Sequence, residues 1–196
     1  ETPGTIAHSW GYNGQEKEWK SSSQIFESLI ANVSLNGGFT LNIGPRANGK
    51  IPHESSTRLN EIGNWLSQHG EAIYAAEGLP LRANNFDWGY LTYKPSPSNP
   101  TVYAHVFNWP MDKILRITGI NTNPKNIYYN SDKKEKKLSF TKNGSILHIN
   151  LPEQSSSDIV SSLRLEYDTL LEIDAEIVPE STYGGFALTT NNLINK

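Results

Sequence analysis

The sequence has no cysteine, no long apolar run and no excess of basic residues. Without cysteine it can form neither a disulfide framework nor a thiolate zinc site or iron–sulfur cluster, and it has no cysteine nucleophile. No stretch reaches the roughly 18 consecutive apolar residues of a membrane-spanning helix. The 17 basic and 20 acidic residues leave a formal net charge of −3, which argues against a duplex nucleic-acid binder. We therefore expect neither a nucleic-acid nor a membrane partner.

The spacing of a metal site and an initial methionine are also missing from the sequence. Five histidines are scattered singly, without the H-E-x-x-H or H-x-H spacing of a metal centre. We expect no metal and no other cofactor. The first residue is Glu1, not methionine, and no signal-like segment follows it, so we interpret the chain as processed or as a piece of a longer protein. With 36% apolar and 10% aromatic residues, the 196-residue chain can still bury a core.

Residues 1–78 show the pattern of a β/α segment. Residues 5–12 predict a short strand that ends in a loop rich in glycine and asparagine. Ser21 and Gln24 have the spacing of a helix capping box. Apolar residues then recur at helical spacing, and Asn36-Gly37 provides a left-handed stop. The apolar residues of this first helix are Ile25, Phe26, Leu29, Ile30 and Val33.

A second strand and a second helix follow. Residues 39–43 alternate between apolar and polar side chains, and a helix opens near Pro52 and stops near Gly70. Two strands cannot complete a parallel sheet, because such sheets are covered by helices on both faces and contain several neighbouring strands. We therefore interpret residues 1–78 as the end of a larger α/β domain whose beginning is absent.

The apolar period changes to two near Asn84. Short, evenly spaced strands separated by Pro, Asn and Ser turns predict an antiparallel β-sandwich. The predicted fold class is thus α/β followed by all-β, with the sandwich over residues 79–174 and a linker or tail over 175–196. The candidate strands are 89–93, 101–107, 113–118, 126–130, 138–141, 145–150, 162–167 and 170–173.

The best candidates for chemistry lie near the N-terminus. Glu1 is the only acid in the first 15 residues, and Trp10 and Tyr12 follow it. Glycoside cleavage needs a proton donor for the leaving oxygen, and aromatic faces stack on the C–H side of pyranose rings. A carboxylate clustered with these aromatics at a strand end would therefore suit a sugar. The alternative, an exposed terminal Glu1 and a core Trp10, is favoured by the pattern alone.

Other polar and aromatic groups have structural interpretations. His8 is expected to be structural or to face solvent, and residues 44–50 lack the GK[ST] spacing of a phosphate loop. The basic run of Lys133, Lys134, Lys136 and Lys137 predicts a solvated hairpin tip that discourages edge pairing. Aromatic residues of the predicted sandwich either line a sugar-binding face or, as we favour, form core and cross-strand pairs. They are Trp88, Tyr90, Tyr93, Tyr103 and Trp109.

Several motifs together resemble the end of the catalytic barrel of α-L-fucosidases. They are S-W-G-Y-N at 9–13, L-N-I-G-P at 41–45 and G-E-A-I-Y at 70–74, in that order. V-Y-A at 102–104 and N-W-P at 108–110 resemble the first strands of that family's C-terminal sandwich. The resemblance covers about residues 1–174. It implies the C-terminal end of a (β/α) barrel followed by an antiparallel β-sandwich.

The resemblance also implies an activity. The family hydrolyses terminal α-L-fucose with retention of configuration. By the resemblance, Glu1 stands at the position of the acid/base glutamate, and Trp10 matches an aromatic near the fucose pocket. The family's nucleophilic aspartate and its sugar-binding histidines lie upstream of Glu1. Retention requires two carboxyl groups about 5 Å apart, and this chain supplies at most one.

The resemblance therefore predicts part of an exo-acting retaining α-L-fucosidase that is inactive by itself. Its expected partners are a fucosylated glycan substrate and the missing N-terminal barrel portion. The substrate class leads us to expect an extracellular or periplasmic location. The sequence departs from the family at Pro3-Gly4 and at Gly38, where asparagine is frequent. A non-catalytic β-sandwich unit that binds carbohydrate or buttresses the barrel is the alternative.

Overall fold

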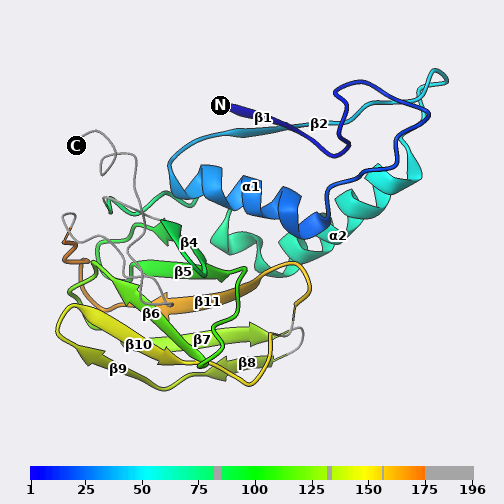
Figure 1. Ribbon diagram of the computed structural model, residues 1–196. Helices are drawn as coiled ribbons and strands as arrows, with labels where there is room; N and C mark the ends of the chain where they lie inside the picture. Colours follow the sequence, from blue (N-terminus) through cyan, green and yellow to red (C-terminus); the bar gives the residue numbers. More distant parts are fainter. Residues whose placement is uncertain (82–84, 132–133, 156, 175–196) are drawn as a thin grey trace, which may run out of the picture.

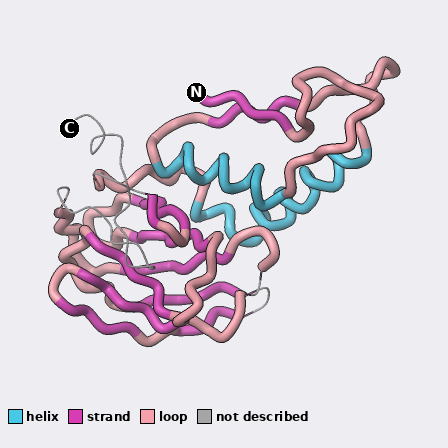
Figure 2. The backbone as a smooth tube through the Cα atoms, viewed as in Figure 1, coloured by secondary structure: helices cyan, strands magenta, loops and turns pink. Residues whose placement is uncertain are grey.

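The structure is a computed structural model, and it describes residues 1–81, 85–131, 134–155 and 157–174. Figure 1 shows a pair of strands at one side, two helices beneath it, and antiparallel sheets beyond the helices. Figure 2 shows the same division, because both long helices lie between the strand pair and the sheets. The predicted tail at 175–196 lies outside the described residues.

The first part has the predicted order of strand, helix, strand and helix. Its elements are β1 (Thr2–Thr5), α1 (Ser22–Ser34), β2 (Phe39–Asn42), α2 (His53–His69) and the short 3-10 helix η1 (Gly70–Ala72). β1 and β2 pair in parallel, with Thr2 opposite Phe39 and Thr5 opposite Asn42. The α/β character of this part is therefore confirmed.

The predicted first strand at 5–12 was wrong, because β1 ends at Thr5. β2 offers only four paired residues before the chain reaches Gly44-Pro45, so nothing remains for residues 6–12 to pair with in a ladder. These residues belong instead to a loop from 6 to 20, whose two ends are joined by an antiparallel bridge between Ala7 and Trp19. Ile6, at the start of this loop, packs inward and is 1% exposed.

The helix ends follow the sequence signals. Gln24 N donates to Ser21 Oγ over 3.1 Å, and Ser21 N donates to Gln24 Oε1 over 2.9 Å, so the capping box is confirmed. The stop after α1 is Asn36, which adopts the left-handed conformation at φ 58°. Gly70 is the C-cap of α2, as predicted.

The second part consists of antiparallel sheets, and this prediction is confirmed. No helix occurs among the described residues from 85 to 174. One sheet has the order β3-β4-β5-β11-β7-β8 and the other the order β6-β10-β9. Their strands are β3 (Asn85–Phe86), β4 (Gly89–Lys94), β5 (Thr101–Val106), β6 (Ile114–Thr118), β7 (Asn126–Ser131), β8 (Lys134–Lys137), β9 (Phe140–Asn143), β10 (Ile146–Asn150) and β11 (Ser161–Glu166).

Three details of the strands differ from the prediction. β3 was not predicted, because two residues are too few to show a period. Three lysines of the predicted hairpin tip, Lys134, Lys136 and Lys137, lie along β8, which pairs with β7 as an antiparallel hairpin and is the edge strand of the six-stranded sheet. Lys133 lies outside the described residues. Lysines at a sheet edge still discourage pairing with another chain. Residues 170–173 form no ladder and contribute only the bridge between Ile120 and Ile173.

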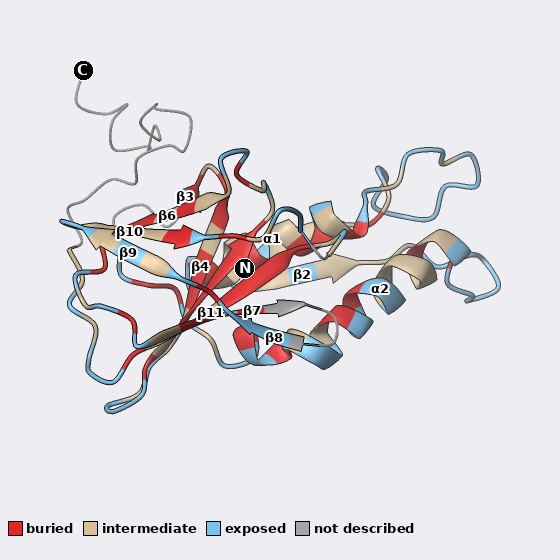
Figure 3. Ribbon diagram, turned by 90° about the horizontal axis from the view of Figure 1, so that it is seen from below, coloured by how far each residue is buried: buried red, intermediate tan, exposed pale blue. Residues whose placement is uncertain are grey.

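One core fills the space between the two sheets. Leu91 and Leu163 of the six-stranded sheet and Leu115 and Ile149 of the three-stranded sheet are fully buried in it. Figure 3 shows this buried strip along the strands. The aromatic residues of this part are also core residues, as we favoured: Trp88 and Tyr103 are 2% and 5% exposed, and Tyr90, Tyr93 and Trp109 are partly buried against the cores.

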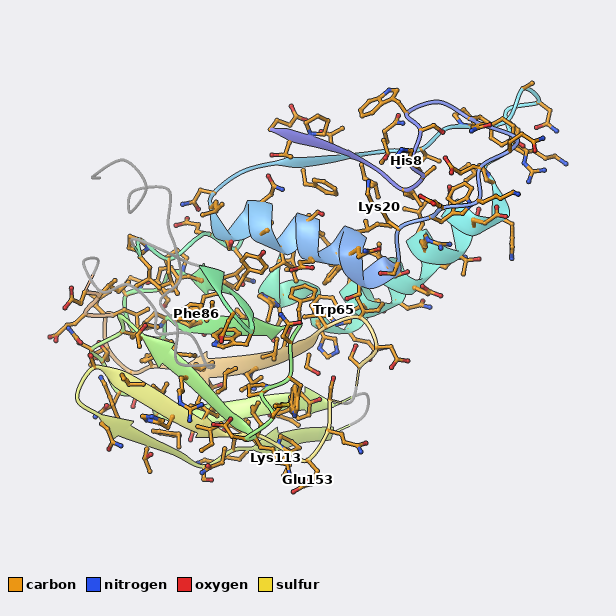
Figure 4. The ribbon with its side chains drawn as sticks, viewed as in Figure 1. His8, Lys20, Trp65, Phe86, Lys113 and Glu153 are labelled. Atoms are coloured by element: carbon orange, nitrogen blue, oxygen red, sulfur yellow. The ribbon has the colours of Figure 1, made fainter. Side chains whose placement is uncertain are left out.

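A second core joins the helices to the outer face of the six-stranded sheet. Phe26 of α1 meets Trp65 of α2 edge to face, with ring centroids 4.5 Å apart. The Trp65 indole N–H donates to the Val160 carbonyl over 3.0 Å, directly before β11. Figure 4 shows Trp65 between the helices and the sheet. Apolar area buried here stabilises both parts at once, at about 25 cal/mol per Å².

A buried hydrogen-bond chain runs through this junction. The Thr92 hydroxyl donates to the Ala72 carbonyl over 2.7 Å and lies 2.8 Å from His105 Nε2. Because that hydroxyl has one proton, Nε2 must be the protonated nitrogen and donate to Thr92. His105 Nδ1 then accepts from the Ser162 hydroxyl, 2.8 Å away. A fully buried neutral imidazole thus connects β11, β5 and β4 to η1.

This chain predicts a specific acid sensitivity. Burial, with repulsion from His69, lowers the pKa of His105 to about 3. In the unfolded chain a histidine has a pKa near 6.5. Between about pH 6.5 and pH 3 the unfolded chain therefore binds a proton at His105, whereas the native state does not. The free energy of unfolding should therefore fall as the pH falls from about 7 to 4, by up to about 1.4 kcal/mol per pH unit.

Urea unfolding of wild type, His105→Gln and His53→Gln at several pH values measures this effect. His105→Gln should be less stable at pH 7 by about 1–3 kcal/mol, because it leaves buried partners unsatisfied, and should lose part of the pH dependence. His53 is exposed at the start of α2, so its variant should keep the wild-type dependence. Identical pH slopes in wild type and His105→Gln would contradict the assignment.

Candidate functional site

Two loops meet at one edge of the parallel strand pair. Residues 6–20 follow β1 and residues 43–52 follow β2. Because parallel strands point the same way, both loops leave from the same edge, which is where α/β proteins build their sites. Figure 1 shows the loops together at the end of the molecule far from the sheets. The S-W-G-Y-N and G-P-R-A-N-G segments lie in these loops.

The two loops are in direct contact. Asn42 Nδ2 donates to the Trp10 carbonyl over 2.5 Å. At Gly44, an added Cβ would lie 2.6 Å from the Tyr12 nitrogen and 2.7 Å from the Gly11 carbonyl carbon. Only glycine allows this approach between two backbones. The Arg46 guanidinium carbon lies 5.8 Å from the Tyr12 ring centroid, within the range of a cation–π contact.

Glu16 stabilises the loop after β1 through hydrogen bonds within the loop. Its carboxylate accepts from the Ser9 backbone N–H and hydroxyl, each at 3.2 Å. It also accepts from the backbone N–H groups of Lys17 and Glu18, each at 3.2 Å. The hydrogen bond from Glu18 N–H, then the one from Ser9 N–H, lower the pKa of Glu16. The role of Glu16 could not be predicted from the sequence, because the contact depends on the path of an irregular loop.

Trp10 and Tyr12 are exposed on these loops. Trp10 is 58% exposed and Tyr12 44% exposed, so the alternative of a core Trp10 is wrong. Large exposed aromatics close together are typical of binding surfaces. His8 is exposed on the same loop, in agreement with a solvent-facing role, and is labelled in Figure 4.

Glu1 lies at the other end of β1. Its carboxylate accepts a hydrogen bond from the Thr40 hydroxyl of β2, and the adjacent Thr2 N–H donates to the Gly38 carbonyl over 2.8 Å. A Cβ at Gly38 would be 3.9 Å from Glu1 Cγ, so the residue at 38 borders this carboxylate. The structure thus groups Glu1 with Thr40, and Trp10 and Tyr12 with Asn42 and Gly44. The four residues of β1, about 13 Å of strand, separate the backbones of the two groups.

Metal-binding clusters and membrane-spanning helices are both absent from the part of the chain that the structure describes. Among the described residues, no group of three or more His, Asp and Glu side chains is arranged to hold a metal ion. Within the same residues, no helix has the length and apolar character needed to cross a membrane.

The close contact at Gly44 predicts a large effect of one methyl group. Gly44→Ala should force the loops apart and lower the free energy of unfolding by about 1–3 kcal/mol. Gly11→Ala on the facing loop is the matched control, because nothing lies within 4 Å of its added Cβ. Denaturant unfolding, together with the rate of proteolysis within residues 6–20, measures both variants. Equal behaviour of the two variants would show that the loops are not packed as described.

Comparison with known proteins places these segments in a family. The family model described as Alpha-L-fucosidase matches residues 1–71. The Alpha-L-fucosidase of Dictyostelium discoideum is 37% identical over 117 residues, which are 59% of this chain and 25% of that protein. The Tissue alpha-L-fucosidase of Bos taurus is 32% identical over 148 residues, 74% of this chain and 31% of that protein.

Solved structures of α-L-fucosidases are also similar to this chain. An α-L-fucosidase from Vibrio sp. strain EJY3 superposes with a TM-score of 0.77 at 27% identity, over 88% of this chain and 30% of that one. Isoenzyme 1 from Paenibacillus thiaminolyticus gives a TM-score of 0.72 at 28% identity, over 87% of this chain and 39% of that one. The chain therefore spans between a quarter and two fifths of the length of these relatives. With its two loops, its parallel pair and its sheets all matched in this way, the chain belongs to the α-L-fucosidase family.

Proposed function

We propose that this chain forms part of an exo-acting, retaining α-L-fucosidase that removes terminal α-L-fucose from glycans. The observation that carries the proposal is the meeting of two family-matched loops at the carboxyl edge of β1 and β2, where Trp10 and Tyr12 are exposed. Barrel enzymes build their sites at this edge. The Thermotoga maritima α-fucosidase, 25% identical with a TM-score of 0.67, is described in complex with fucose, which supports fucose as the sugar.

The open strand pair supports a partner that completes a barrel. β1 and β2 form a sheet of two strands only, covered by the helices on one side. Parallel sheets are stable with several strands and with both faces covered. We therefore propose that further β/α units of a barrel, carrying the nucleophilic aspartate, pair with this segment.

In the proposed mechanism Glu1 is the acid/base and Trp10 binds the sugar. Glu1 would protonate the departing oxygen and then activate water, with the Thr40 hydroxyl holding its carboxylate. The exposed Trp10 ring would stack on the apolar face of fucose. The role of Glu1 rests on the resemblance alone, because Glu1 lies at the start of β1, whereas barrel sites gather at strand carboxyl ends. A direct test of Glu1 is therefore the most informative experiment.

The alternative is a non-catalytic β-sandwich unit. A sugar-binding face on the sandwich loses support, because Trp88 and Tyr103 are buried in the cores. Buttressing is compatible with catalysis elsewhere, since the sheet packs on both helices through Trp65 and Val160. We therefore assign the sheets a supporting role within the enzyme. On the substrate class we propose an extracellular or periplasmic location.

The complete enzyme with Glu1→Gln tests the acid/base role. General acid–base help is worth about 10²–10⁴-fold, so turnover of a natural glycan should fall by that factor. With an activated aryl fucoside the covalent intermediate should accumulate, and azide should restore turnover and yield the α-fucosyl azide. Glu18→Gln is the matched control, because the Glu18 side chain is exposed on the nearby loop. Wild-type rates for Glu1→Gln on a natural glycan would move the role to another carboxylate.

The 196-residue chain alone should be inactive, since retention needs a second carboxyl group about 5 Å from the first. Incubation of the purified chain with an aryl fucoside, with no other polypeptide present, measures this. Mixing it with the remaining barrel units should restore hydrolysis. Turnover by the isolated chain would show that it carries both carboxylates.

A further inference from the structure

A polar cleft lies away from the two loops, where α1 and α2 meet the segment that leads into β11. Its volume is about 570 Å³, within the range of small-molecule sites. The walls are the first residues of α1, one side of α2 and residues 157–159. The fucosidase proposal uses none of these residues.

The walls of the cleft are held in place. The Ser23 hydroxyl of α1 donates to the Ile159 carbonyl over 2.8 Å, and the Trp65 indole donates to the Val160 carbonyl over 3.0 Å. Trp65 is only 6% exposed, so it forms the floor of the cleft and belongs to the core at the same time. Figure 4 places Trp65 at this junction. A site with fixed walls loses little conformational entropy on binding.

Polar side chains without partners line the cleft. Among the described residues, the side chains of Asn64, Gln68 and Asp158 make no hydrogen bond to protein, although all three border the cleft. The Ser22 hydroxyl donates to Glu61 Oε2, which leaves the other carboxylate oxygen of Glu61 as an acceptor. Amides, hydroxyls and carboxylates thus offer both donors and acceptors over a short distance.

The charge of the lining narrows the ligand class. The cleft is lined by two acidic side chains, Glu61 and Asp158, and by no lysine or arginine; His69 is the one lining residue that can carry a positive charge, so the lining favours a neutral ligand over a phosphate. A hydroxyl group can donate to a carboxylate and accept from an amide at once, so polyhydroxylated molecules match this lining. The side chain of Ile159 and the small exposed part of Trp65 offer a limited apolar contact for the C–H groups of a ring.

We propose that this cleft is a second carbohydrate-binding site, which holds a neutral saccharide unit away from the fucose-cleaving loops. The site goes beyond the proposed function, because binding here requires neither the barrel nucleophile nor Glu1. It would hold part of a glycan at the enzyme surface while another part reaches the loops.

Titration of the 196-residue chain with lactose and with L-fucose tests the proposal. The indole N–H resonance of Trp65 is the readout, because this group lies beside the cleft and donates to Val160. We expect a saturable shift at millimolar sugar. Each lost hydrogen bond is worth about 0.5–1.5 kcal/mol, so Asn64→Ala and Gln68→Ala should each weaken binding about 2–12-fold.

The control is Gln154→Ala, which removes an exposed amide on the same connection but outside the cleft lining. It should bind like wild type. Unchanged positions of the sugar-free Trp65 resonance show that the variants fold alike. The proposal is overturned if neither sugar shifts the resonance, if Asn64→Ala and Gln68→Ala bind like wild type, or if only putrescine or inorganic phosphate binds.

Discussion

The contact of Trp65 with both helices and with the start of β11 is the interaction on which the arrangement of the molecule depends. Its ring packs on Phe26, and its only polar atom is satisfied by the Val160 carbonyl. A four-residue parallel pair and two helices cannot bury enough apolar surface to be stable alone. By joining the second core to the six-stranded sheet, Trp65 gives the α/β segment a rigid support.

The buried hydrogen bonds of His105 fix the orientation of the parts that Trp65 joins. Apolar packing tolerates small shifts, whereas three hydrogen bonds of 2.7–2.8 Å fix η1 against β4, β5 and β11 in one register. Since η1 directly follows α2, the position of α2 is fixed as well. The loop after β2 leads into the other end of α2, so the sheets indirectly define where residues 43–52 stand. In this way the sheets contribute to the position of a loop at the far end of the molecule.

Features set by local chemistry could be predicted from the sequence, and those set by distant partners could not. The capping box at Ser21 and Gln24 and the stop at Asn36 depend on neighbouring residues, and the structure has both. The end of β1 depends on the length of β2, which lies more than thirty residues away in the chain. The same reason explains why Glu16 and His105 carried no signal. Their partners come from an irregular loop or from other strands.

The S-W-G-Y-N and L-N-I-G-P motifs can be recognised in the sequence, but their structural roles cannot be predicted from it. Most of S-W-G-Y-N was included in a predicted strand, but it follows β1 as a loop and meets a second loop. L-N-I-G-P is explained in the same way: Asn42 binds the facing backbone, and Gly44 leaves room for it. The two motifs therefore form one contact, which neither motif makes alone. Glu1 takes no part in this contact between the loops, because its hydroxyl partner, Thr40, lies within the strand pair and not at its loop edge.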